Sequence, residues 1–338
     1  MTFELHNGKM EDVLLQYPAG YFDSCVSDFP YGLSFMGKSW DYKVPSVAQC
    51  LEIYRALKPG AYLLAFGGPR TYHRIVCNIE DAGFEIRDQI SWVFGSGFPK
   101  SSNQKGEWKG WGSGLKPAHE PICVARKPLI GTIPKNLSIY GTGALNIEGC
   151  KIGESNGRWP ANLIHDGSDE VLSLFPESPG QLAPVGPENG LRNSVNCYGN
   201  YGARDRFEPR EDLDKSAARF FYSAKASRKD RNEGCEHMAP GKLNWSSGEK
   251  NPGSFQSDKT DRTSPNNHPT VKPTALMRYL VRLVTRPGGH VLDPFCGSGS
   301  TGKACMLENM QFTGIDIDPH SINISECRIS WAHKQMAI

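Results

Sequence analysis

The chain has 338 residues, with 38 Lys and Arg against 36 Asp and Glu, and a net charge of +2. This length exceeds one compact domain and predicts a catalytic domain that carries a sizeable insertion, while so small a net charge indicates no polyanionic partner by itself. No apolar run approaches 18 residues, and the first residues lack a basic start followed by an apolar stretch, so we expect a cytoplasmic protein that neither spans a membrane nor is exported.

The first half of the chain alternates strand and helix patterns. Residues 22–27 form a short apolar run typical of a buried strand, and 47–57 have helical apolar spacing that ends at a Lys-Pro-Gly sequence. Residues 61–66 predict another buried strand, and 69–82 predict a helix that starts at a proline and is closed by a glycine. This βαβα order predicts an α/β fold with a mostly parallel sheet.

The middle of the chain changes character. Residues 84–94 and 121–125 read as strands on either side of a Gly- and Lys-rich loop at 95–118. Residues 128–265 are rich in Gly, Pro, Asn and Ser and contain no long amphipathic stretch, so they predict a large irregular insertion.

A first motif, Asp28-Phe29-Pro30-Tyr31, follows the expected strand at 22–27. It places a carboxylate, a carbonyl-bearing turn and an aromatic ring within four residues, which suits holding a planar base by its exocyclic amino group. Open α/β sheets bind ligands just beyond the carboxyl ends of their strands. These four residues are therefore our candidate catalytic group, although Asp and Pro also favour simple turns.

A second motif, the glycine loop Asp293-Pro294-Phe295-Cys296-Gly297-Ser298-Gly299, predicts a cofactor site. It follows a β-type segment at 289–292 and opens a helix, and its glycines let backbone approach a ligand. A second strand, 312–316, ends in an acid placed to take two ribose hydroxyls. The candidate residues for S-adenosylmethionine are Asp293, Phe295, Gly297, Ser298, Gly299 and Asp316.

A third segment, His268-Pro269-Thr270-Val271-Lys272-Pro273, leads into an expected helix at 274–285. With all three motifs in this order, the chain resembles the DNA amino-methyltransferases, adenine-N6 or cytosine-N4, of the permuted β arrangement. The resemblance implies a Rossmann-like S-adenosylmethionine-dependent methyltransferase sheet with circularly permuted motif order. In such a sheet, the expected strands at 84–94 and 121–125 would form an antiparallel hairpin at the edge. The resemblance also implies that His268, Thr270 and Lys272 lie beside the methionine end of the cofactor.

The resemblance implies a division of the chain and a set of partners. Residues 1–127 would form the catalytic half, 128–265 a target-recognition insertion whose DNA-contacting loop begins near 98, and 266–338 the cofactor-binding half. DNA is the implied substrate, a homodimer and a restriction endonuclease are candidate partners, and a prokaryotic or phage origin is expected.

The identity of residue 28 bears on the target base. In the resembling family, Asp at this position is commonest among adenine-N6 enzymes and Ser among cytosine-N4 enzymes, so adenine is favoured and cytosine is the alternative. The chain departs from the family where Phe29 replaces the usual first proline, which we expect to loosen the turn. It also has Gly8-Lys9 where the family often has Gly-Asp, so the acidic contact there is not carried over.

Two other functions compete with methylation. Residues 297–302 also satisfy the dinucleotide G-x-G-x-x-G pattern, which allows a nicotinamide-dependent dehydrogenase. That interpretation has no use for the motif at Asp28 or for the segment 268–273. A regulator with a dead cofactor pocket is the other alternative, and the intact Asp28 and Tyr31 argue against it.

Positive charge is unevenly distributed along the chain. Residues 98–160 hold seven Lys and two Arg against four Glu, with Trp108 and Trp111 among them, and a second cluster of Lys and Arg spans 215–231. Such patches contact nucleic-acid phosphates, whereas a solvated charged face is the alternative. The candidate DNA-binding residues are Lys100, Lys105, Lys109, Lys215, Arg219, Lys225 and Arg228.

The ten cysteines include no C-x-x-C pair, which favours reduced thiols over a disulfide framework. The spacing of Cys150, His165, Cys197, Cys235 and His237 matches no common zinc pattern. We therefore expect scattered, partly buried cysteines and no metal site.

Overall fold

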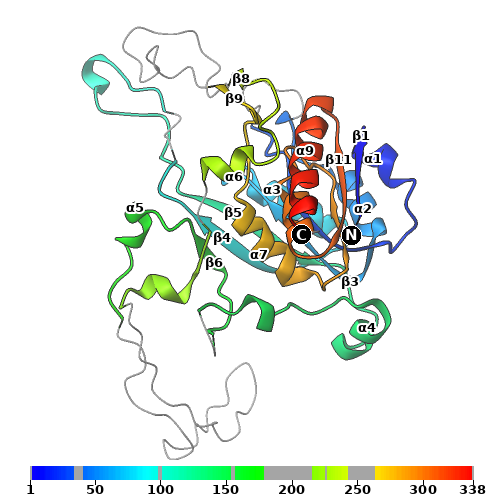
Figure 1. Cartoon of the computed structure of the whole chain (residues 1–338). Helices are drawn as coiled ribbons and strands as arrows, with labels where there is room; N and C mark the ends of the chain where they lie inside the picture. Colours follow the sequence, from blue (N-terminus) through cyan, green and yellow to red (C-terminus); the bar gives the residue numbers. More distant parts are fainter. Residues whose placement is uncertain are drawn as a thin grey trace, which may run out of the picture.

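The computed structural model describes residues 2–33, 41–97, 101–153, 157–178, 215–224, 227–242 and 263–336. Its centre is a nine-stranded sheet with helices on both faces (Figure 1). In spatial order the strands are β1 (Phe3–Asn7), β11 (Gln311–Asp316), β10 (His290–Asp293), β2 (Phe22–Asp28), β3 (Leu57–Phe66), β5 (His119–Arg126), β4 (Glu85–Val93), β6 (Leu163–His165) and β7 (Tyr222–Ser223). β8 (Gly241–Lys242) and β9 (Thr263–Ser264) form a separate antiparallel pair.

Nine α-helices lie in the described part of the chain. They are α1 (Met10–Leu14), α2 (Val47–Ala56), α3 (Tyr72–Asp81), α4 (Ile133–Tyr140), α5 (Asp169–Leu172), α6 (Arg228–Asn232), α7 (Thr274–Val284), α8 (Ser300–Leu307) and α9 (Pro319–Gln335). None of the described helices is long and apolar enough to cross a membrane.

The sheet is mostly parallel, as the sequence predicts. Among its described strands only β5 runs against its neighbours, β3 and β4. The hairpin of β4 and β5 does not form the edge of the sheet, because β6 pairs with β4 and β7 pairs with β6, both in parallel. That expectation was wrong, and the expected irregular insertion at 128–265 contributes these two strands, β6 and β7, to the nine-stranded sheet. They are three and two residues long, too short for any periodicity to reveal them.

The expected boundaries shift slightly at α2. A capping box at Ser46 starts this helix, with its side chain accepting from the amide of Gln49, but the helix ends at Ala56. Leu57 already belongs to β3, so the Lys-Pro-Gly sequence lies in the strand and does not follow the helix as a separate stop.

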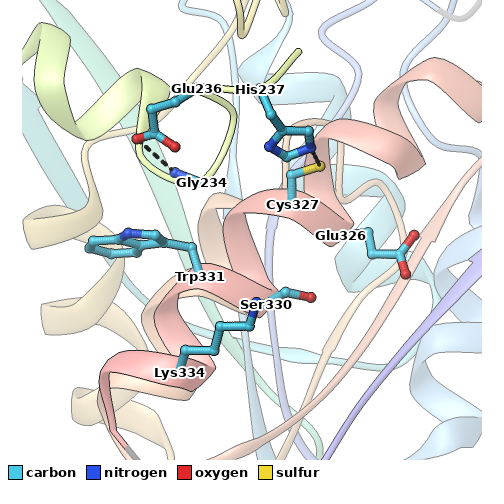
Figure 2. Close-up of a pocket in the computed structure, with 8 residues that line it drawn as sticks. All are labelled: Gly234, Glu236, His237, Glu326, Cys327, Ser330, Trp331 and Lys334. Atoms are coloured by element: carbon cyan, nitrogen blue, oxygen red, sulfur yellow. Dashed lines mark hydrogen bonds between the residues drawn. The ribbon is translucent and has the colours of Figure 1, made fainter. Parts of the chain in front are cut away.

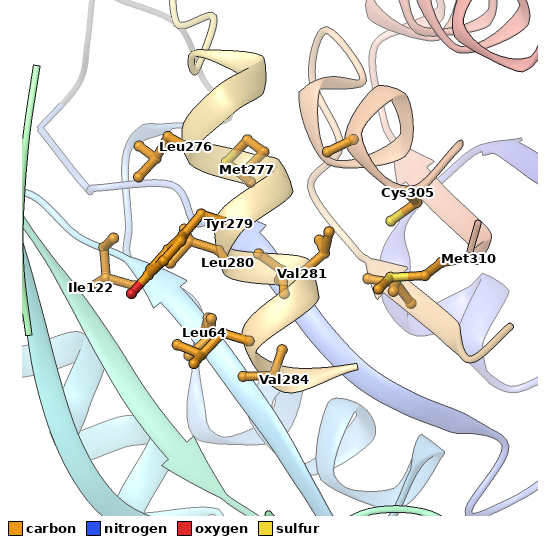
Figure 3. Packing of buried hydrophobic residues seen from close by; sticks show 14 of the residues in the cluster. Leu64, Ile122, Leu276, Met277, Tyr279, Leu280, Val281, Val284, Cys305 and Met310 are labelled. Carbon is orange, nitrogen blue, oxygen red and sulfur yellow. The ribbon is translucent and has the colours of Figure 1, made fainter. Parts of the chain in front are cut away.

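Two hydrophobic clusters fill the two faces of the sheet. Alternate residues of β3 point in opposite directions, so that Leu64 packs with α7 and α8 while Leu63 packs with α1, α2 and α3. Figure 3 shows the first cluster, in which the apolar face of α7, including Leu280 and Val284, covers the sheet. Figure 1 shows α7 and α9 in front of the sheet.

The strand order reverses between β10 and β2. The chain leaves β10 through α8 toward β11 on one side, and leaves β2 through α2 toward β3 on the other. In open α/β sheets this switch point is where ligands bind, beyond the carboxyl ends of the strands. Asp28 ends β2 and Asp293 ends β10, so both motifs lie at that place.

Candidate active site

A cavity of about 430 Å³ lies at the switch point. This volume is within the range of small-molecule sites. Both predicted groups contribute to its wall, and Gly8 and Lys9 of the segment after β1 also line it. The predicted residues that line the cavity are Asp28, Pro30, His268, Thr270, Lys272, Asp293, Phe295, Gly297, Ser298 and Asp316.

The glycine loop after β10 needs its glycines for shape. Gly297 has a φ of 50° and Gly299 a φ of 71°, both in the left-handed region that favours glycine. A Cβ on Gly297 would lie 3.0 Å from the ring of His268, and one on Gly299 would lie 2.9 Å from the backbone of Ser325. Gly299 caps α8 and does not itself line the cavity.

Asp316, at the end of β11, faces the same loop. Its carboxylate accepts hydrogen bonds from the amide of Gly297 at 2.8 Å and from the amide of Asp318 at 2.9 Å. Burial raises the pKa of this carboxyl above its usual value, opposed by the two amide hydrogen bonds. Asp316 therefore braces the glycine loop and keeps acceptor capacity toward the cavity.

His268 lines the cavity as a neutral ring. Burial lowers its pKa to about 4, with the positive charges of Arg328 and Arg231 adding to the effect. Its Nδ1 accepts from the amide of Thr270 at 3.3 Å, which assigns the remaining proton to Nε2. A neutral donor thus faces the glycine loop.

The catalytic turn after β2 is held by groups distant in sequence. Asp41 Oδ1 accepts from the amides of Tyr31 at 2.7 Å and Gly32 at 2.9 Å, and Thr71 donates to the carbonyl of Tyr31 at 2.6 Å. Phe29 is 2% exposed, and its ring meets that of Phe295 edge to face at 5.3 Å. The packing of Phe29 thus supports the turn that its replacement of proline is expected to loosen. It also links the turn to the glycine loop.

A cluster of charges surrounds Asp28. The ammonium of Lys272 lies 2.7 Å from Asp28 Oδ2 and 3.1 Å from Glu120 Oε2. The hydroxyl of Tyr31 donates to Asp28 Oδ1 at 2.9 Å and lies 3.2 Å from Glu120 Oε2. Burial raises the pKa of Tyr31 well above its usual value, and both carboxylates raise it further. Lys272, predicted as a cofactor ligand, therefore lies among the predicted catalytic residues.

Sequence reasoning missed Glu120. It belongs to β5, whose antiparallel pairing with β3 brings its first residues to the edge where β2 and β3 end. The hairpin expected from the sequence carries a signal for Glu120, because the first residues of an antiparallel strand lie beside the carboxyl ends of its parallel neighbours. Asp41 was missed as well, and its sequence context carries no comparable signal.

The end of the insertion is anchored on the cofactor half. Lys303 of α8 is 1% exposed and pairs with Asp230 at 2.7 Å and Glu233 at 2.8 Å. Asp230 also accepts from the amide of Thr274 at 2.7 Å, which holds the start of α7. Burial raises the pKa of Asp230, but its bonds to Lys303 and Thr274 outweigh burial and lower the pKa overall. A buried network thus joins α6, α7 and α8.

The side chains of four of the seven predicted DNA-binding residues are described, and they lie on two separate segments of the chain. Lys105 and Lys109 are exposed on the loop between β4 and β5, which projects from the sheet (Figure 1). Lys215 is exposed, whereas Arg219 donates to the carbonyls of Ser216 at 2.7 Å and Ser178 at 2.6 Å. The remaining predicted positions are Lys100 and Lys225, which lie outside the described residues, and Arg228, which begins α6 and whose side chain is not described.

A second hollow, of about 370 Å³, lies between residues 234–237 and α9 (Figure 2). Cys327 Sγ lies 3.5 Å from His237 Nε2 there, and burial raises the pKa of the Cys327 thiol. Cys235 contacts the carbonyl of Ile324, and Cys150 that of Tyr279, so these cysteines do not meet. Among the described residues no three His, Cys, Asp or Glu side chains converge for a metal, and Cys197 lies outside them.

Two curated methyltransferases are similar to part of this chain. The chain is similar to the Type II methyltransferase M.Cfr9I of Citrobacter freundii, with 37% identity over 86 residues, 24% of this chain and 29% of that protein. It is similar to the DNA adenine methyltransferase YhdJ of Escherichia coli (strain K12), with 39% identity over 66 residues, 20% of this chain and 22% of that protein. The matches thus span less than a third of the length of these relatives.

The fold has solved counterparts. The structure of PvuII DNA methyltransferase, described as cytosine-N4-specific, aligns with 99% of this chain and 93% of its own, with a TM-score of 0.52 and 13% identity. At that identity the likeness shows the fold alone. The N6/N4 family model described as DNA methylase matches residues 22–326, which is most of the chain. The chain therefore belongs to the DNA methylase family, as its three motifs predict.

Proposed function

We propose that the protein is an S-adenosylmethionine-dependent DNA methyltransferase that methylates an exocyclic amino group, with adenine N6 as the preferred target. One observation carries the proposal. Asp28, which suits an amino group, and the Gly297 loop with Asp316, which suits a nucleoside cofactor, line a single cavity at the switch point of the sheet.

The residues of this cavity fit S-adenosylmethionine. The absence of a Cβ at Gly297 lets the ring of His268 lie close to the glycine loop, and Asp316 retains acceptor capacity suited to ribose hydroxyls. Nε2 of His268 offers a neutral donor, and Phe295 offers an apolar wall. When bound, this cofactor supplies a methyl group on a sulfonium sulfur.

The amino nitrogen of adenine or cytosine is a poor nucleophile, because its lone pair is delocalised into the ring. Asp28 accepts one N–H, and the backbone carbonyl of Phe29 or Pro30 accepts the other, which draws the nitrogen toward tetrahedral geometry. Tyr31 stacks on the base once it has left the helix and offsets part of the few kcal/mol that unstacking and unpairing cost. Transfer then depends on positioning more than on acid or base strength.

Adenine is preferred over cytosine because residue 28 is Asp, which is commonest among adenine-N6 enzymes of the family. One similar protein, YhdJ, is named as a DNA adenine methyltransferase, which agrees with this choice. Cytosine N4 is the second candidate. The likeness to PvuII methyltransferase does not favour it, since that likeness concerns the fold alone.

The wider organisation is proposed on the same basis. Residues 1–127 and 266–338 form the two halves of the catalytic domain, and 128–265 recognise the target together with the loop that begins near 98. A homodimer and a restriction endonuclease are the partners to seek. The two strands that the insertion adds to the sheet make it a part of the catalytic domain's framework as well.

The test is direct. The protein is incubated with S-adenosylmethionine carrying a labelled methyl group and with unmethylated DNA, and the DNA is digested to nucleosides. We expect labelled N6-methyldeoxyadenosine, whereas N4-methyldeoxycytidine would select the second candidate. If the DNA carries no label, the proposal fails, and the cofactor-binding regulator remains. Family membership already disfavours the dehydrogenase alternative, which a nicotinamide binding assay checks.

A further inference from the structure

A buried ammonium sits beside the proposed catalytic carboxylate. Lys272 Nζ lies 2.7 Å from Asp28 Oδ2 and 3.1 Å from Glu120 Oε2, and its side chain is 7% exposed. Lys272 and Asp28 nevertheless both line the cavity. Burial lowers the pKa of Lys272, but the two carboxylates outweigh burial and raise it above its ordinary value. The group is therefore an ammonium at neutral pH.

Together these side chains form an acceptor next to a donor. An ionised Asp only accepts hydrogen bonds, and a charged Lys only donates them. Adenine and cytosine present the complementary order on their Watson–Crick edge, an amino N–H beside an unprotonated ring nitrogen. Guanine has its amino group beside N1–H, which is a second donor, and thymine has no amino group. On the Watson–Crick edge, the pair thus matches both amino bases that the family methylates and neither guanine nor thymine.

We propose that Lys272 donates a hydrogen bond to the ring nitrogen beside the target amino group, N1 in adenine or N3 in cytosine, while Asp28 accepts from the amino group itself. The proposal rests on the proposed function and deepens it, because it names a specificity-determining residue for the flipped base. Lys272 has three N–H donors, and its longest hydrogen bond is the one to the Tyr31 hydroxyl, at 3.3 Å. The ring nitrogen takes the place of that hydroxyl.

Glu120 acts as a positioning residue for Lys272. It is a second carboxylate within 3.1 Å of the ammonium, so that the Lys272 head group does not depend on Asp28 alone. This matters during base entry, because Asp28 must then share its oxygens with the amino group. The ring of Phe66, 5.0 Å from Lys272 Nζ, adds a cation–π contact that keeps the head group in place.

The experiment replaces one ring atom of the target. After the methylated position in DNA has been located, duplexes are made with 1-deazaadenine at that position, or with 3-deazacytosine if cytosine is the target. Each analogue keeps the amino group and replaces the ring nitrogen with C–H. Single-turnover rates of wild type and of Lys272→Met are compared on natural and analogue duplexes, so that the intrinsic reactivity of the analogue cancels.

We expect wild type to lose about 10- to 100-fold on the analogue, the range of a hydrogen bond to a charged group. Lys272→Met should be slow on natural DNA and lose no more than about 2-fold further on the analogue, the scatter expected of independent sites. Equal losses for the two proteins overturn the proposal. For an adenine target, 7-deazaadenine is the matched control, since it changes an edge that Lys272 does not face and should cost both proteins the same.

Two further measurements cover other outcomes. Lys272→Met leaves two carboxylates without their cation, so Glu120→Gln replaces it in the experiment if it does not fold. For Glu120→Gln we expect the loss of rate on the analogue duplex, relative to the natural duplex, to be smaller than for wild type. Calorimetry should give Lys272→Met the same affinity for S-adenosylmethionine as wild type. If this variant loses that affinity but is still slowed by the analogue as much as wild type, Lys272 belongs to the cofactor site and the proposal is overturned. Failure of the proposed function itself is seen earlier, as wild-type protein that methylates no natural DNA.

Discussion

The hydroxyl of Ser27 donates a 2.6 Å hydrogen bond to Asp293 Oδ1 and so joins β2 to the end of the neighbouring strand, β10. The other oxygen of Asp293 accepts from Thr301 at 2.6 Å. Ser27 precedes the catalytic turn and Asp293 precedes the glycine loop. The buried carboxyl, 2% exposed, thus fixes the two motifs relative to each other beneath the cavity.

Asp293 makes stability depend on pH. Burial raises its pKa from 3.8 to about 7, although its hydrogen bonds to Ser27 and Thr301 oppose the shift. Between these values the folded protein holds a proton that the unfolded chain has released. The contribution of Asp293 to stability is therefore full below pH 3.8 and is lost as the pH rises through about 7.

Asp293→Asn should remove this dependence. We expect the free energy of unfolding of the variant, relative to wild type, to rise between pH 5 and pH 8 by on the order of a few kcal/mol. Chemical denaturation of both proteins across this range measures the difference, in which the titration of His268 and other groups cancels. A difference that does not change with pH would mean that Asp293 ionises at its ordinary value.

Asp28→Ala should abolish methyl transfer. The carboxylate is proposed to touch the base amino group and not the cofactor, so we expect a loss of at least about 10²- to 10³-fold in the transfer rate, with cofactor affinity within a few-fold of wild type. Rapid-quench kinetics and calorimetry measure the two quantities. Asp28→Asn is the matched variant, since it keeps the size of the side chain and removes its charge. Near-normal turnover in either variant contradicts the catalytic assignment.

Part of this site was predictable because parallel strands end at one edge. The sequence places the motif after 22–27 and the loop after 289–292 each at the carboxyl end of a strand, and such ends of one parallel sheet are where ligands bind. The contacts around these two motifs could not be predicted from the sequence. Lys303 pairs with Asp230 across 73 residues of chain, and nothing local to either residue indicates the other. Glu120 was within reach, since the expected hairpin carries it to the catalytic edge.

Asp316→Ala should weaken cofactor binding by about 1.5 to 3 kcal/mol, through the loss of charge-assisted hydrogen bonds to the ribose. Isothermal titration with S-adenosylmethionine measures the change. Because Asp316 also accepts from the amide of Gly297, Asp316→Asn is the informative control: its amide oxygen can keep the backbone bond while the charge is removed. Wild-type affinity in the Asn variant would restrict Asp316 to bracing the loop.

We expect the loop between β4 and β5 to contact the phosphates of the DNA backbone. Lys105 and Lys109 are exposed on it and flank η3 (Gly106–Trp108), and the rings of Trp108 and Trp111 meet edge to face at 5.4 Å, both more than half exposed. Changing both lysines to glutamine should weaken DNA binding similarly for all sequences. It should also reduce the slope of log affinity against log salt by up to about 0.9 for each phosphate that the protein no longer neutralises.

Base choice should survive the same change, because Asp28 is proposed to select the base inside the cavity after flipping, far from the phosphates. Fluorescence anisotropy over a range of salt concentrations gives the slope, and nucleoside analysis gives the product. Lys135 of α4 and Lys334 of α9 are exposed lysines outside the loop, and their double glutamine variant is the control for net charge. If the loop variant and this control both keep the wild-type slope of log affinity against log salt, the loop lysines are only solvent-exposed. The DNA-binding surface must then be sought near Lys215.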